Sequence, residues 1–234
     1  MVVERSINIV VANNMKIDNK IIEEIKKTAE GYFVDASSCH DWTHVERVYN
    51  LAVKIAKKEG ANIGIIKIAA YLHDIGRKEE MDKKGKVCHA EIGFELAEEI
   101  LSKYNLGEEV VKNIRHCILT HRYRNNHKPE TIEAKVLFDA DKLDSIGAVG
   151  VARDFLFAGF YGGLLYVGNE KEVAENAADY AYTKKDTALL EYYYKLRKVK
   201  ASILTKTGKE IAKERHEYMA GFFKRFDLEV KGKL

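Results

Sequence analysis

The sequence has few of the features that mark special classes of protein. It contains a single proline, Pro129, and no apolar run approaching the roughly 18 residues that a membrane-spanning helix requires. The acidic Glu4 and the short apolar stretch after it do not form a secretory signal. We therefore expect a cytoplasmic protein that does not associate with a membrane.

Cysteine and net charge are also scarce. The three cysteines, Cys39, Cys88 and Cys117, each stand beside a histidine, but no Cys-x-x-Cys pair suggests a zinc site. Their odd number and wide spacing argue against disulfides, so we expect small buried side chains. The 39 basic and 36 acidic residues leave a net charge of only +3, which predicts no nucleic-acid partner.

Apolar residues recur at three- and four-residue spacing along most of the chain, which predicts an all-α, multi-helix bundle. We expect helices over residues 17–31, 62–75, 88–104 and 108–121. Another helix runs from a capping box at Ser38 to residue 60, and a further one begins at about residue 131. Two long helices are expected over 185–228. Residues 17–234 would form one domain, with a core at about 35–150 and a C-terminal helical extension. Residues 1–16 form an N-terminal arm without an assigned structure, and the Gly-aromatic stretch 158–168 is a loop that serves as a connector or a lid.

Histidines and aspartates fall on the apolar sides of these helices. His73 and Asp74 end the nearly all-apolar run "IIKIAAYLHDI", while His44 and Asp141 lie on the apolar faces of other helices. A buried carboxylate costs several kcal/mol unless it is paired or bound to a metal. Neighbouring residues of a helix point about 100° apart, so His73 and Asp74 need ligands from other helices. His44 and Asp141 are the natural suppliers, and such mixed donors suit Mn, Fe, Co, Ni or Zn.

Further histidines extend this pattern. His89 and His121 continue the apolar faces of their helices, whereas His116 falls off the face that His121 continues. His40, four residues before His44, is expected to form a local hydrogen bond rather than to bind a metal.

The pattern H…HD…D, with "LHDIG" after an apolar helix and "DADKLD" from residue 139, resembles the HD-domain superfamily of metal-dependent phosphohydrolases. A closer likeness to small stand-alone bacterial and archaeal HD hydrolases extends through "DSIGAVGVARDF" and "KTGKEIAKERHEYM". The resemblance implies that one divalent metal is held by His44, His73, Asp74 and Asp141. Some HD families bind a second metal through two more histidines, for which His89 and His121 are candidates and His116 or His127 alternatives.

The resemblance further implies that metal-activated water cleaves a phosphate ester of a nucleotide or another small phosphorylated metabolite. Asp74 would act in catalysis as a metal ligand, and His121 or His116 would protonate the leaving oxygen. The cations expected to bind the substrate phosphate are Arg77, Lys142 and Arg122.

Two other functions remain open at this point. A di-iron HD-type oxygenase would require both His89 and His121 as ligands, and a non-catalytic sensor would bind a nucleotide without turnover. "HDIGRKE" lacks the Glu-Asp pair of alarmone hydrolases, and no GYP signature of cyclic di-GMP hydrolases follows. The aromatic C-terminal helices are also candidates for a homodimer interface.

Overall fold

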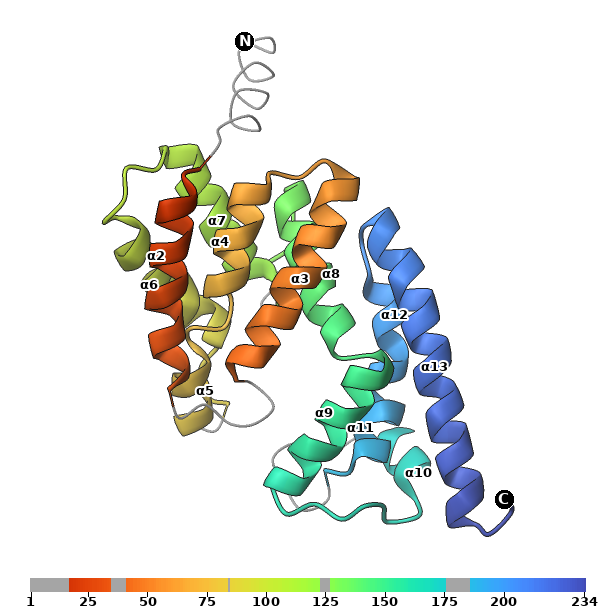
Figure 1. The fold of residues 1–234 in the computed structure, drawn as a ribbon. Helices are drawn as coiled ribbons and strands as arrows, with labels where there is room; N and C mark the ends of the chain where they lie inside the picture. Colours follow the sequence, from red (N-terminus) through yellow and green to blue (C-terminus); the bar gives the residue numbers. More distant parts are fainter. Residues whose placement is uncertain (1–16, 35–40, 84, 123–126, 176–185) are drawn as a thin grey trace. The chain divides into compact units, whose positions relative to one another are not determined.

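The computed structural model describes residues 17–34, 41–83, 85–122, 127–175 and 186–234. Every regular element in these ranges is a helix, which confirms the all-α prediction (Figure 1). The chain divides into two compact units, one ending at Ala140 and the other beginning at Asp141, so the boundary falls within helix α8. The N-terminal arm and His40 lie outside the described residues, and the single domain over 17–234 stays a prediction.

None of the helices in the described part of the chain is long and apolar enough to span a bilayer. The first unit contains α2 (Asn19–Glu30), η1 (Gly31–Phe33), α3 (Trp42–Glu59), α4 (Ile63–Leu72), α5 (Arg77–Asp82), α6 (His89–Leu101), α7 (Glu108–Thr120) and most of α8 (Ile132–Asp144). The predicted helices are present, with shorter ends. The short helix α5 was not predicted, because its sequence "RKEEMD" has no apolar periodicity.

Helix α3 begins at Trp42, and the capping-box residue Ser38 lies outside the described residues. Asp41 is itself the N-cap, and its Oδ1 accepts hydrogen bonds from the backbone N of His44 at 3.3 Å and from Thr43 Oγ1 at 2.6 Å. A carboxylate in this position also suits the positive end of the helix dipole. The cap places His44 in the first turn of α3.

Helix α4 is the centre of the first unit and contacts α2, α3 and α7 (Figure 1). The predicted burial of this apolar helix is confirmed, since every residue from Ile68 to Leu72 is buried. Tyr71 on α4 stacks with Trp42 at 5.9 Å and with Tyr49 at 4.8 Å between ring centroids, both on α3. Trp42 and Tyr71 each precede a site histidine by two residues, so this aromatic stack aligns His44 with His73.

The turn after α4 lies directly against α6. A Cβ added to Gly76 would approach His89 O to 2.5 Å and Gly93 N to 2.9 Å, distances that the backbones do not allow. Gly76, the N-cap of α5, is therefore needed for close packing, and it holds the His73–Asp74 turn next to the start of α6.

The start of α8 is fastened within the first unit by the buried Glu133. Its Oε1 accepts a hydrogen bond from the backbone N of Asn62 at 2.7 Å, and its Oε2 accepts one from Asn113 Nδ2 at 3.0 Å. Asn62 begins α4 and Asn113 lies on α7, so one carboxylate ties three helices together. The helix that carries Asp141 is thereby anchored beside α4.

The second unit contains α9 (Gly147–Phe160), α10 (Glu170–Glu175), α11 (Ala188–Tyr194), η2 (Leu196–Lys198), α12 (Val199–Ser202) and α13 (Lys206–Val230). The prediction of two long helices over 185–228 is wrong for the first of them. The chain is extended at Ile203 and restarts at the N-cap Thr205, whose hydroxyl accepts from Gly208 N at 3.0 Å. The predicted loop at 158–168 also begins later, because α9 continues to Phe160.

Aromatic residues of the C-terminal region form packing contacts inside this unit. Phe155 on α9 lies against Phe222, Phe223 and Phe226 on α13, and Tyr192 on α11 stacks on Phe223 at 4.3 Å. These contacts join α9, α11 and α13 into one core. The homodimer stays a prediction.

Asp154 on α9 is a buried carboxyl with an unsatisfied atom. It is 8% exposed, and its Oδ2 has no hydrogen-bond partner within the described ranges. Burial and the nearby negative charge of Glu191 raise the pKa of Asp154 well above its usual range. The folded protein therefore holds a proton that the unfolded chain releases.

We expect Asp154→Asn to increase stability at alkaline pH. Because the folded-state pKa is raised, the wild type loses stability as pH rises through that pKa, whereas the amide does not titrate. Urea unfolding from pH 5 to pH 9 should show curves that converge in acid and diverge by about 1–3 kcal/mol at the alkaline end. Glu210→Gln, at an exposed site of the same unit, is the control, and a gap that does not change with pH would contradict the expectation.

Candidate metal centre

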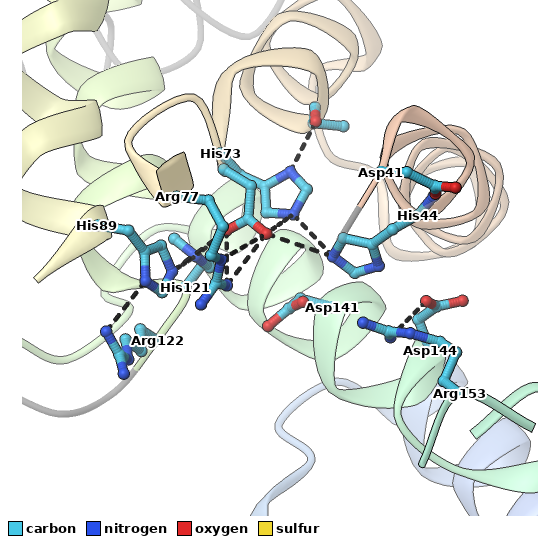
Figure 2. Close-up of polar contacts among 12 residues, drawn as sticks. Asp41, His44, His73, Arg77, His89, His121, Arg122, Asp141, Asp144 and Arg153 are labelled. Atoms are coloured by element: carbon cyan, nitrogen blue, oxygen red, sulfur yellow. Dashed lines mark hydrogen bonds and ion pairs between the residues drawn. The ribbon is translucent and has the colours of Figure 1, made fainter. Parts of the chain in front are cut away.

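Four histidines surround the carboxylate of Asp74, and all five side chains are at most 1% exposed. Asp74 Oδ1 lies 3.2 Å from His89 Nε2 and 3.4 Å from His121 Nε2. Its Oδ2 lies 3.6 Å from His44 Nε2 and 3.8 Å from His73 Nε2. Figure 2 shows these rings directed toward one another. One carboxylate thus stands between two pairs of imidazoles.

The donor atoms form two groups that could each hold a metal ion. In each group the ligand atoms lie within 4.8 Å of one another: Asp74, His89 and His121 in one, and His44, His73 and Asp141 in the other. Asp141 follows Ala140 on α8, and the anchored start of that helix brings its side chain to His44 and His73. All six residues that the sequence predicted as primary or second-metal ligands therefore occur in these groups.

Backbone carbonyls fix the protonation of two of the rings. His73 Nδ1 lies 2.8 Å from Ala70 O, and His121 Nδ1 lies 2.5 Å from Ile118 O. A carbonyl oxygen can only accept, so Nδ1 must carry the proton in both rings. In the neutral imidazole Nε2 is then left with its lone pair directed at the cluster.

Glu80 fixes the third ring. Its Oε2 lies 2.8 Å from His89 Nδ1. Burial would raise the pKa of Glu80, but His89, Arg77 and Arg122 outweigh it and lower the pKa to about 2, so the group is a carboxylate that accepts from Nδ1–H. Burial also lowers the pKa of His89, which favours the neutral ring. His89 Nε2 is therefore a lone-pair donor as well.

These assignments leave acceptors facing acceptors in the group of Asp74, His89 and His121. His89 Nε2 and His121 Nε2 are 3.0 Å apart, with Asp74 Oδ1 at 3.2 Å and 3.4 Å from them. No proton from either ring is available at these contacts, so the lone pairs repel unless a cation lies among them. The donor set therefore fits a divalent metal, and its nitrogen and oxygen atoms suit Mn, Fe, Co, Ni or Zn.

Arg77 forms salt bridges with both Asp74 and Glu80. Its Nη2 lies 2.9 Å from Oδ1 and 3.0 Å from Oδ2, while its Nη1 lies 2.9 Å from Glu80 Oε2. Burial would raise the pKa of Asp74, but the Arg77 guanidinium opposes this, and the pKa lies well below its usual range. Asp74 is thus an anion in a buried site.

The other residues that the sequence singled out differ in their burial and in their hydrogen-bond partners. Arg122 Nη1 contacts Glu80 Oε1 and lies 3.0 Å from His89 Nδ1, and Lys142 Nζ lies 2.9 Å from Asp141 Oδ2. His116 is only half-buried, and its Nε2 accepts a hydrogen bond from Glu130 N at 3.0 Å. Cys117 is buried as expected, and its Sγ donates to Asn113 Oδ1 at 3.8 Å.

Sequence reasoning missed Glu80. The residue stands in the charged run "RKEEMD", and nothing in that run distinguishes it from Glu79. The i, i+3 spacing from Arg77 was the available signal, and it is common on exposed helices. Only the packing of α5 against α6 makes Glu80 buried and Glu79 exposed.

Comparison with known proteins places this arrangement in a family. The HD domain profile matches residues 41–146, which include both donor groups. Over 217 residues the chain is 33% identical to YpgQ of Bacillus subtilis, covering 91% of this chain and 95% of YpgQ. The chain belongs to the HD-domain superfamily. This confirms the resemblance seen in the sequence.

Solved structures agree with this HD-domain assignment. The crystal structure of YpgQ in complex with ADP is similar with a TM-score of 0.69 at 30% identity, covering 90% of this chain and 98% of YpgQ. An HD-superfamily hydrolase from Bacillus thuringiensis gives a TM-score of 0.67 at 30% identity, with 91% and 98% covered. HD domains bind divalent metals, and the two His/Asp groups are where this chain could hold them.

We expect divalent metal to stabilise this HD protein strongly. Ions that bind only the folded state at about 1,000 times Kd add about 4 kcal/mol, or roughly 10 °C in Tm for a chain of this size. Thermal unfolding of chelator-stripped protein with and without Mn²⁺ measures the shift. His121→Ala should reduce both the shift and the number of bound ions, whereas His116→Ala on the same helix should change neither. Equal behaviour of the two variants would contradict the proposed donor group.

Proposed function

We propose that this protein is a metal-dependent phosphohydrolase that cleaves a phosphate ester of a nucleotide or a similar small phosphorylated metabolite. The observation that carries the proposal is the convergence of the His89 and His121 lone pairs on Asp74 Oδ1 without protons to bridge them. Membership of the HD-domain superfamily, and similarity to structures described as HD-superfamily hydrolases, support the hydrolytic class.

In this proposal His44, His73 and Asp141 hold one ion, His89 and His121 hold a second, and Asp74 serves both. Bound divalent ions would supply Lewis acidity and a water whose pKa is lowered toward neutrality. Asp74 is suited to a shared role because one oxygen faces each pair of histidines. Arg77 keeps that carboxylate ionised and fixes its orientation, because its Nη2 donates to Oδ1 and its Nε donates to Oδ2.

The substrate class is inferred from charge and from one relative. YpgQ, which is similar over nearly the whole chain, has been crystallised in complex with ADP. Of the three cations predicted to bind phosphate, Arg77 and Arg122 direct their guanidinium groups to Asp74 and Glu80, with side chains 16% and 14% exposed. Lys142 is 23% exposed and pairs with Asp141. We therefore assign the main phosphate contact to Lys142.

His121 acts as a ligand in this proposal, which leaves protonation of the leaving oxygen to another group. His116 was the alternative, and its Nε2 already accepts the Glu130 N–H. Its Nδ1 is consequently the atom that would carry and donate a proton. The role of His116 as general acid stays a prediction.

A di-iron oxygenase is the second candidate, because the structure brings both His89 and His121 to Asp74, as that function requires. The hydrolase descriptions of similar structures favour the phosphohydrolase. Metal identity separates the two: two irons per chain with no phosphate release would support the oxygenase. A well-occupied metal site with neither activity would support a nucleotide sensor.

The first test is release of phosphate and diphosphate from a panel of nucleotides and sugar phosphates, with metal content measured on the same protein. We expect Asp74→Asn to bind fewer ions and to lose activity by about 10²–10³-fold, because the amide cannot serve as an anionic ligand. Glu108→Gln, an exposed site on α7, is the matched control. An Asp74→Asn variant with full activity would disprove the proposal.

We expect Lys142→Met to raise KM for the nucleotide about tenfold with little change in kcat, because it removes a charge that binds substrate and transition state alike. Steady-state kinetics at saturating metal measure both constants, and ion content should equal that of the wild type. An unchanged KM would assign Lys142 to its ion pair with Asp141 alone.

A further inference from the structure

Glu80 is the one buried acid of α5, and it touches none of the cluster's Nε2 atoms. It is 1% exposed, and its contacts are Arg77 Nη1 at 2.9 Å, His89 Nδ1 at 2.8 Å and Arg122 Nη1. A residue so placed affects the cluster only through the side chain that it holds, which is His89.

One acceptor and one donor compete around His89 Nδ1. Glu80 Oε2 requires a proton on Nδ1, whereas Arg122 Nη1, 3.0 Å away, can only donate and would require a lone pair there. The second arrangement would put the ring proton on Nε2, where Asp74 Oδ1 at 3.2 Å could accept it. Each tautomer would therefore find a hydrogen-bond partner for its N–H group, and another feature must select between them.

The two tautomers differ in what they can bind. With the proton on Nδ1, Nε2 is free to donate its lone pair to a metal beside Asp74 and His121. With the proton on Nε2, His89 becomes a hydrogen-bond donor to Asp74 and cannot be a ligand through that atom. The ionised Glu80 decides between them, because a carboxylate facing an Nδ1 lone pair at 2.8 Å would be repelled.

We propose that Glu80 is a positioning residue that selects the metal-binding tautomer of His89 and so sets the occupancy of the Asp74/His89/His121 group separately from that of the His44/His73/Asp141 group. This inference rests on the proposed metal function. The rings of His73 and His121 are oriented by the backbone carbonyls of Ala70 and Ile118, which no substitution removes. Among these three rings, only His89 depends on a side chain for its tautomer.

The contacts with two arginines explain how the Glu80 carboxylate can be buried beside His89. Arg77 and Arg122 both contact Glu80, and Arg77 also contacts Asp74, so two cations face two buried anions. Without Glu80, Arg122 would keep its position beside His89 Nδ1 and become that atom's hydrogen-bond donor. Loss of Glu80 therefore both removes the acceptor and frees the competitor.

The experiment uses Glu80→Met in the full chain, because methionine has a similar length and lacks the oxygen that accepts from Nδ1–H. Nitrogen-15 NMR of the metal-free protein, with His89 assigned by comparison with His89→Ala, reports which ring nitrogen carries the proton. We expect Nδ1–H in the wild type and Nε2–H in Glu80→Met. Titration with Mn²⁺ in chelator buffers should show that the second ion binds about 10–100-fold more weakly in the variant, while the affinity of the first ion is unchanged.

Two variants serve as controls. Glu79→Met makes the same chemical change on the neighbouring residue, whose side chain is 53% exposed, and should bind both ions like the wild type. Arg122→Gln removes the competing guanidinium but keeps Glu80, and should leave the proton of His89 on Nδ1.

An unchanged tautomer with unchanged affinities in Glu80→Met would overturn the inference. So would equal weakening of both ions, which would make Glu80 a support of the whole site, and so would a wild type that binds a single ion. Phosphate release by the wild type is scored separately. Selective loss of the second ion without any phosphate release would leave this inference standing while the proposed phosphohydrolase function fails.

Discussion

The buried negative charge of Asp74 is the constraint on which the rest of the first unit depends. A carboxylate that is 1% exposed cannot be left uncompensated, because desolvating an isolated anion costs several kcal/mol. Arg77 supplies a positive charge, and four imidazoles place a nitrogen within 3.8 Å of the carboxylate oxygens. The helices of this unit are arranged so that these groups, widely separated in sequence, reach the same carboxylate.

The precision of the arrangement comes from contacts around the site rather than from the ligands. The stack of Tyr71 between Trp42 and Tyr49 aligns α3 with α4, and Gly76 allows the turn after α4 to lie on α6. Glu133 fastens α8 to the starts of its neighbours. Backbone carbonyls at the ends of α4 and α7 then orient His73 and His121. A site that is held by main-chain atoms and packed rings loses little entropy when an ion binds.

The histidines of the two donor groups are not all held in the same way. His73 and His121 are held by neutral carbonyls, whereas His89 is held by the ionised Glu80, which is balanced by Arg77 and Arg122. A carboxylate behind a ligating imidazole increases its basicity more than a carbonyl does. One protein can therefore hold two ions with different affinities in neighbouring places.

The sequence by itself determined the all-α class, the burial of α4 and the residues that form both donor groups. Helical periodicity and the pattern H…HD…D were enough for this, because both are local or fixed by spacing. The sequence did not determine where α3 begins or that the chain breaks at Ile203, because an N-cap Asp and a capping-box Asp look alike without backbone angles. Only the tertiary structure decided that Arg77 and Arg122 face carboxylates and that Glu80, not Glu79, lies behind His89. The physical reason is that burial and hydrogen-bond partners depend on which helices pack together. The sequence does not distinguish a charged residue that is exposed to solvent from one that is buried in the core.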